Sequence, residues 1–327
     1  MKDFVIDKFN ASKKVFRFVQ DVLPEMRNTE VFKLIRKEVI KVNGKKADSN
    51  HILKEGDKVS FFLADIHFKN KGKQDEKFQS VSAKLDVIFE DNDILVVNKP
   101  AGLLVHPDKK EFKNTLTEIS KAYLYRKGEY KPNNFFAPSP THRLDTNTSG
   151  LVVIAKNQTS LKNITQKFRD RETAKTYLAL AFGKITNKIL LTSFIDASEN
   201  KENKVSVIDF KVLHVIPDKK EFLENNKTLC ATLITPIKSA TNCTLVEVDL
   251  WTGKKHQIRT HLQSNQNPLL GDNKYYTKAS MSLSQMFDIK NYFLHSYKLQ
   301  IEGYPLLKAS VPKEFKKIVY DILKYEI

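Results

Sequence analysis

A single aspartate lies in a segment of the chain that is rich in polar side chains. Asp145 belongs to residues 142–150, which read HRLDTNTSG. A carboxylate can act as a nucleophile, as a general base or as the partner of a cation. Asp, Asn, Ser and Thr also close Asx turns, so an ordinary turn residue is an equal alternative for Asp145. His142 and Arg143 would then be surface residues.

Tyr177 stands on a predicted strand, residues 174–183, whose two faces differ. Side chains alternate along a strand, so Leu178 and Leu180 share one bulky face. Tyr177 shares the other face with two alanines, and small neighbours leave room above an aromatic ring. Ordinary packing of Tyr177 in the sheet is the alternative.

Arg259 falls on a predicted helix in the segment 251–262, which reads WTGKKHQIRTHL. Ile258 and Leu262 mark the apolar stripe of this helix, and Arg259 lies at its edge, from where it can reach a neighbouring cleft. His256 and His261 lack the HExxH pattern of a metal site, so we interpret them as structural hydrogen-bonding residues.

The chemistry open to these residues is limited by the number of carboxylates. Glycosidic bond cleavage normally needs two, and no second acid accompanies Asp145 in the informative segments. A single Asp suffices where no water attacks the sugar and the detached nucleobase is rejoined to it. The isomerisation of uridine to pseudouridine is such a reaction, with Asp as nucleophile or as base at the sugar. It requires no cofactor and no metal.

The charge of the chain favours a polyanionic partner. Lys plus Arg number 55 against 38 Asp plus Glu, a formal net charge of +17. Cations that neutralise phosphates release counterions, which favours nucleic acid; a general lysine bias is the alternative. Cys230 and Cys243 form no disulfide framework, and neither a signal core nor a membrane-spanning stretch is present, so we expect a cytoplasmic protein.

The elements that position these residues fall into two units joined by a linker. Residues 1–66 form a small unit, with a helix from Asn28 or Thr29 to about Val39, a strand and turn at 42–45, and a strand at 59–63. Residues 67–84 are polar and read as a flexible linker. Residues 85–327 form a large unit dominated by strands. The polar segments 200–203 and 219–227 are predicted to be surface loops.

Four segments of the large unit together resemble the RluA-type pseudouridine synthases. They are residues 98–107, 142–151, 175–177 and 252–261, in the family's order. The resemblance implies that Asp145 is the catalytic residue and that Arg143 helps to extrude the target nucleotide and fills its place. It implies that Tyr177 stacks on the uracil, as a candidate for removing the C5 proton, and that Arg259 pairs with Asp145. An opposite charge keeps a partly buried carboxylate ionised.

The small unit resembles the RNA-binding domain named after ribosomal protein S-four, with its αL motif. The family's usual Gly before the Val-Asn-Gly strand is absent. This second resemblance implies that Arg27, Lys33, Arg36 and Lys37 contact phosphates, which gives affinity without sequence reading.

Together the resemblances imply an α+β fold. The catalytic domain would be a mixed, largely antiparallel sheet with flanking helices and an RNA-binding cleft, preceded by the αL-motif domain. We expect an RNA pseudouridine synthase that acts as a monomer, without cofactor, on large-subunit ribosomal RNA. A non-catalytic RNA-binding factor in ribosome assembly is the alternative, although binding alone does not require the set of Asp145, Tyr177 and Arg259.

Overall fold

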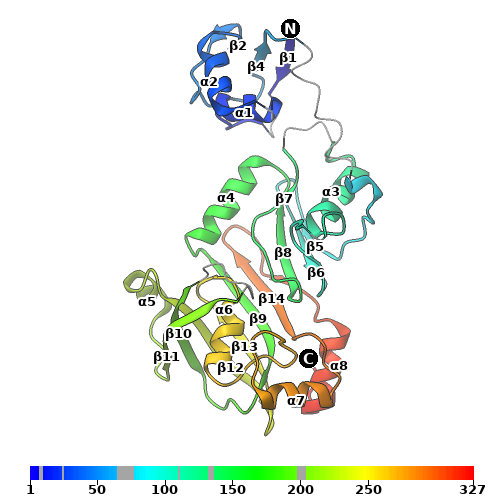
Figure 1. Ribbon diagram of the computed structural model, residues 1–327, viewed down its shortest axis with the longest axis vertical. Coiled ribbons are helices and arrows are strands. Elements are labelled where there is room, and N and C mark those ends of the chain that lie inside the picture. The colour runs from blue at the N-terminus through cyan, green and yellow to red at the C-terminus, as the bar shows by residue number, and fades with distance from the viewer. Residues whose placement is uncertain (7–9, 24–25, 65–76, 110, 132–135, 197–203) are drawn as a thin grey trace.

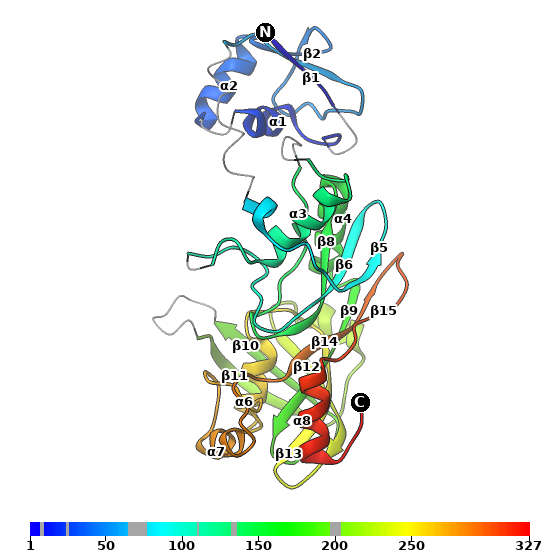
Figure 2. The same cartoon turned by 90° about the vertical axis from the view of Figure 1, so that its right-hand side faces the viewer.

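Two β-sheets organise the described part of the chain, one in each unit (Figures 1 and 2). The computed structural model describes residues 1–6, 10–23, 26–64, 77–109, 111–131, 136–196 and 204–327. The predicted loop at 200–203 lies outside these residues. None of the described helices is long and apolar enough to cross a membrane.

The N-terminal unit is a four-stranded sheet with two helices and its own core. Its elements are β1 (Lys2–Val5), α1 (Val15–Val22), α2 (Asn28–Arg36), β2 (Ile40–Val42), β3 (Lys45–Lys46) and β4 (Lys58–Phe61). The predicted turn is present, with Asn43 at φ 51° and Gly44 at φ 74°, as a two-residue hairpin loop requires. Helix α2 ends before Val39 because Glu38 has a left-handed φ of 58° and turns the chain into β2.

Part of the predicted linker packs on the large unit. Residues 65–76 lie outside the described residues, but Lys77–Ser80 form a 3₁₀ helix. Phe78 is fully buried, with its ring 5.3 Å from that of Tyr125 and 5.5 Å from that of Tyr130. Phe78 therefore belongs to the core of the large unit, which begins before Leu85. The boundary was predicted too late because the residues around Phe78 are mostly polar.

The large unit is built on an eleven-stranded sheet of order β11-β10-β12-β13-β9-β14-β8-β6-β5, with β15 paired to β14 and β7 to β8. Only the short β8–β14 pair is parallel among the described strands, which confirms the predicted mixed, largely antiparallel sheet. The strands are β5 (Val87–Glu90), β6 (Ile94–Lys99), β7 (Ser139–Pro140), β8 (Ser149–Ala155), β9 (Thr173–Phe182), β10 (Ile189–Asp196), β11 (Ser206–Leu213), β12 (Cys230–Ser239), β13 (Cys243–Leu250), β14 (Leu294–Ile301) and β15 (Leu307–Lys308).

Helices cover both halves of this sheet. In Figures 1 and 2, α3 and α4 flank the half that contains β8, and α6, α7 and α8 flank the half that contains β13. The helices are α3 (Leu116–Arg126), α4 (Gln158–Arg169), α5 (Lys219–Asn225), α6 (Gln257–Ser264), α7 (Lys278–Met286) and α8 (Lys313–Leu323). Helix α5 corrects the prediction of a loop at 219–227. Phe222 and Leu223 of α5 pack against the cluster that holds Trp251, and the Phe222 and Trp251 rings lie 5.7 Å apart. These two residues are adjacent in an otherwise polar segment, so the amphipathic pattern of the helix is weak.

Alternation along β9 separates two cores, as the sequence predicts. Tyr177, Ala179 and Ala181 belong to the largest core, which also holds residues of β6, β8, α3 and α6. Leu178 and Leu180 belong to a second core that is covered by α8. Because both faces of β9 are buried, its position is rigid, and Tyr177 is held firmly beneath the candidate site.

Candidate active site

Asp145 lies in the loop between β7 and β8, at the start of a tight turn. Its backbone carbonyl accepts a hydrogen bond from the Thr148 N–H at 3.0 Å. Its carboxylate Oδ2 accepts from Arg259 Nη1 at 3.2 Å, and the side chain is 25% exposed. The turn uses the backbone and leaves the carboxylate to Arg259, so the turn interpretation and the site interpretation are compatible.

Lys99, the last residue of β6, ties the Asp145 loop to the loop that follows β6. Its ammonium donates to the carbonyl oxygens of Leu103 at 2.8 Å, Thr146 at 2.9 Å and Pro100 at 3.0 Å. Burial lowers the pKa of Lys99 to about 7, against the opposing pull of the Asp145 carboxylate. Sequence reasoning gave Lys99 no role. The only signal available in the sequence was a lysine at the end of an apolar strand, because its burial is visible only in the structure.

Gly150 sits where β8 and β14 come together, five residues after Asp145. Its φ is +111°, and a Cβ at this position would lie 2.2 Å from the backbone oxygen of Ser296. The neighbouring Ser149 Oγ lies 2.9 Å from His295 Nδ1. Only glycine allows this approach, which sets the end of the Asp145 loop against β14.

Arg259 projects from α6 and connects two carboxylates. In addition to Asp145, it contacts Asp272 with two hydrogen bonds, from Nε at 2.7 Å and from Nη2 at 2.8 Å. Its guanidinium lies 4.5 Å from the ring centre of Tyr292 and 5.0 Å from that of Tyr275. Burial is the largest single effect and would lower the pKa of Arg259, but the hydrogen bonds with Asp272 and the electrostatic interactions with Tyr292, Asp272 and Asp145 together outweigh it and raise that pKa. Arg259 is therefore a fixed cation with a fixed orientation.

Asp272 is a second acid that sequence reasoning missed. Its side chain has no exposed surface, and Oδ1 also accepts from the backbone N–H groups of Lys274 at 2.9 Å and Tyr275 at 3.1 Å. A glycoside hydrolase needs a second carboxyl group that is able to carry or take up a proton. Asp272 is occupied by Arg259 on both oxygens, so its geometry fits an anchor and not a second catalytic acid.

His256 and His261 both form hydrogen bonds, as predicted, but only His256 borders the site. His256 Nδ1 lies 2.8 Å from the Tyr275 hydroxyl, and Nε2 lies 3.9 Å from Asp145 Oδ2. Burial lowers the pKa of His256 to about 4, so the imidazole facing Asp145 is neutral. His261 is buried between Ser193 and Thr232. Among the described residues no group of three metal-ligating side chains occurs.

Tyr177 is 6% exposed and lies within electrostatic range of Asp145. Burial raises the pKa of Tyr177 to about 12. The Asp145 charge adds to this rise, and a hydrogen bond with Ser296 opposes it. The phenol is therefore protonated at neutral pH, which favours its ring as a contact surface.

The remaining predicted residues are exposed and separate from this cluster. Arg143 is exposed in the same loop as Asp145 and lowers the pKa of His106, after the larger effect of burial. Four exposed cations lie on or beside α2 of the N-terminal unit, namely Arg27, Lys33, Arg36 and Lys37. The structure thus brings Asp145, Tyr177 and Arg259 together. The α2 cations lie apart from them, on the N-terminal unit.

Comparison with known proteins identifies the family of the chain. The sequence model of the family described as RNA pseudouridylate synthase matches residues 93–264. An RNA pseudouridine synthase of Mycoplasma genitalium is 28% identical, over 99% of this chain and 98% of its own. The ribosomal large subunit pseudouridine synthase C of Rickettsia conorii is 31% identical, over 87% of this chain and 88% of its own.

Solved structures show the same fold. Human RNA pseudouridylate synthase domain containing 4 superimposes with a TM-score of 0.55 at 20% identity, over 72% of this chain and 91% of its own. The chain therefore belongs to the RluA-type RNA pseudouridylate synthases, enzymes that isomerise uridine to pseudouridine in RNA.

Proposed function

We propose that this enzyme isomerises uridines in large-subunit ribosomal RNA and that Asp145 is its catalytic residue. The observation that supports this best is the contact of the Asp145 carboxylate with Arg259, whose orientation is held by Asp272 and two tyrosine rings. A fixed cation holds the carboxylate in one orientation, at a place where the approach of RNA would exclude water.

The proposed reaction breaks one bond and forms another within a single nucleotide. The bond from C1′ to N1 breaks, uracil turns, and C1′ bonds to C5. C5 then loses its proton and N1 gains one. Asp145 acts either by attacking the sugar or by removing a sugar proton. Tyr177 contacts the face of the detached uracil, and its protonated phenol is a weak base for the C5 proton.

The two roles of Asp145 differ in a measurable way. Removal of a sugar proton at C2′ predicts a slower reaction when C2′ carries deuterium, because that bond breaks in the reaction. Attack at C1′ predicts an unchanged rate with this substitution and a covalent adduct between RNA and Asp145, detectable by mass.

Access to a uridine in structured RNA requires that the nucleotide leave its stack. Arg143 is exposed two residues before Asp145 and is suited to occupy the vacated place. Arg27, Lys33, Arg36 and Lys37 would hold the RNA through its phosphates. Relatives from Rickettsia conorii and Vibrio vulnificus are named for the large ribosomal subunit, which supports that target and a cytoplasmic location.

A replacement experiment tests the central claim. Cells that carry only the Asp145→Asn variant are compared with wild type by mapping pseudouridine in large-subunit ribosomal RNA. We expect specific sites to be lost while protein level and RNA binding persist, because the amide keeps the shape of the side chain. Modification at wild-type level would refute the role of Asp145. Sites found only in another RNA class would refute the target.

A further inference from the structure

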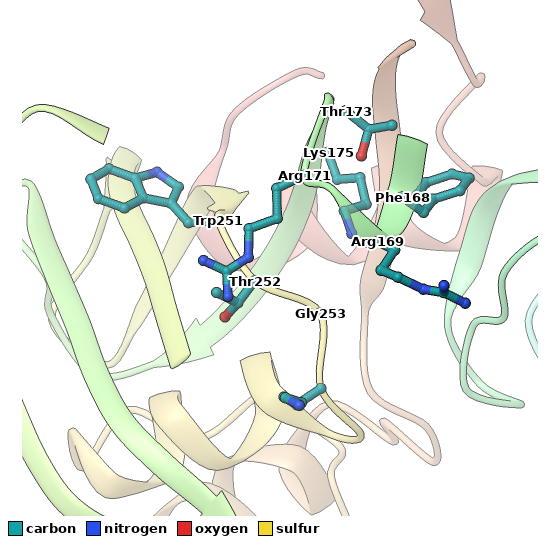
Figure 3. Close-up of a pocket in the computed structure, with 9 residues that line it drawn as sticks. Phe168, Arg169, Arg171, Thr173, Lys175, Trp251, Thr252 and Gly253 are labelled. Carbon is teal, nitrogen blue, oxygen red and sulfur yellow. The ribbon is translucent and has the colours of Figure 1, made fainter. Parts of the chain in front are cut away.

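A basic pocket lies between the end of α4, the start of β9 and the loop that follows β13 (Figure 3). It has a volume of about 300 Å³. The lining residues are Phe168, Arg169, Arg171, Thr173, Lys175, Trp251, Thr252, Gly253 and Lys254. Four of these nine described residues are basic and none is acidic, so the lining suits an anion.

Thr173 places a buried hydroxyl group in the lining of the pocket. The residue is 94% buried, and its Oγ1 has no hydrogen-bond partner among the described residues. Figure 3 shows this oxygen on the side of Lys175. A buried hydroxyl without a partner is costly, so it indicates a polar group that the protein binds from outside.

Two of the cations are held in place without a carboxylate partner among the described residues. Lys175 Nζ lies 5.4 Å from the centre of the Phe168 ring, and burial, followed by repulsion from Lys219, lowers the pKa of Lys175 to about 8. Arg171 has a left-handed φ of 64°, and its Nη2 donates to the carbonyl oxygen of Lys227 at 2.8 Å. Strained backbone and crowded cations are features of binding sites.

The pocket is joined to the candidate active site by three short pieces of chain. His142 comes three residues before Asp145, and its ring lies 4.5 Å from that of Phe168, which lines the pocket. Lys254 comes two residues before His256, which faces Asp145. Lys175 precedes Tyr177 by two residues on β9, roughly 7 Å along the strand.

We propose that this pocket binds a phosphodiester of the substrate strand, on a nucleotide close to the target uridine. Lys175, Lys254 and Arg169 contact the phosphate oxygens, and the Thr173 hydroxyl donates to one of them. The inference rests on the proposed RNA substrate, and it adds a subsite that fixes the strand on one side of Asp145. Such a contact gives affinity and register but no base preference.

Trp251 makes the pocket directly observable, because it is the only tryptophan in the chain. The full chain is titrated at low salt with a short oligouridylate, and Trp251 fluorescence is followed. Inorganic phosphate and uridine are titrated separately. The variants are Lys175→Gln and Thr173→Val. The control Lys317→Gln removes one charge from an exposed position of α8, on the opposite side of β9.

We expect a saturable change with oligouridylate, a much weaker one with phosphate, and none with uridine. Lys175→Gln should weaken oligouridylate binding about tenfold or more, because a charge-assisted hydrogen bond is lost. It should also flatten the dependence of log affinity on log salt by about 0.7. Thr173→Val should weaken binding about two- to tenfold without loss of thermal stability, since its hydroxyl has no internal partner. Lys317→Gln should bind as wild type does.

Equal affinity of wild type and Lys175→Gln, or an unresponsive Trp251, would overturn the pocket assignment. Phosphate that binds as tightly as oligouridylate would overturn the RNA strand as the ligand. The Asp145→Asn variant should show the wild-type fluorescence titration. A failure of the catalytic proposal, seen as retained pseudouridine formation in that variant, is thus distinguishable from a failure of the subsite.

Discussion

Replacing Asp272 with Asn would remove the charge that orients Arg259. The Asp272 side chain is completely buried and accepts two hydrogen bonds from the guanidinium. Breaking a buried ion pair by removing one partner costs about 3–5 kcal/mol. Arg259 would keep its contacts with Asp145 and with two tyrosine rings. We therefore expect a loss of stability at the lower end of this range, about 3 kcal/mol.

This loss has two readouts. At about 2–4 °C per kcal/mol for a unit of this size, Tm should fall by roughly 6–12 °C. Catalysis should fall about a hundredfold under single-turnover conditions, because a guanidinium that moves by about 1 Å no longer holds Asp145 in position. Thermal unfolding and pseudouridine formation on the same preparation, below its Tm, measure both.

Two further variants separate this explanation from general damage. Asp145→Asn removes the other partner of Arg259 but leaves Asp272, so activity should disappear while stability changes by less than about 1 kcal/mol. Asp321→Asn alters an exposed carboxylate of α8 and should stay within about 0.5 kcal/mol of wild type. An Asp272→Asn protein with wild-type stability and rate would refute the anchoring role.

Three other changes have defined outcomes. Tyr177→Phe should keep RNA affinity but slow turnover, and full activity in a kinetic assay would limit Tyr177 to packing. Removal of residues 1–66 should weaken RNA binding and reduce its salt dependence, and an unchanged salt slope would show that the N-terminal cations make no phosphate contacts. The folded pKa of Lys175, about 8, lies below its ordinary 10.5, so folding releases a proton between these values. The free energy of unfolding should therefore rise as pH increases from about 8 to 10.5, and this rise should be smaller in Lys175→Met, as urea titrations at several pH values would show.

The local patterns of the sequence predicted most elements that carry the site. The alternation along 174–183 depends on near neighbours, and this segment is a strand with the expected faces. The segment containing Asp145 could be identified from the sequence because the family motif is contiguous. From residue chemistry alone, a turn and a catalytic segment were equally good interpretations, and the backbone does form a turn.

Partners that lie far apart in the sequence could not be predicted in the same way. Asp272 contacts Arg259 across 13 residues, and Lys99 contacts the carbonyl of Thr146 across 47. The importance of each arises from burial, which a single sequence does not reveal. The unpaired hydroxyl of Thr173 is also a tertiary feature, because any threonine at the start of a strand has the same local pattern.

The place of β14 in the sheet has a consequence for how the protein is made. Among the described strands it joins β9 to β8, yet it is the last long strand to leave the ribosome. Until residues 294–301 emerge, the half-sheet with Asp145 and the half-sheet with Arg259 have no shared strand. The N-terminal unit, with its own core, emerges first and can fold alone. If the cations of α2 bind RNA as proposed, a nascent chain would gain that surface long before it gains a competent centre, and partial products would occupy RNA without modifying it.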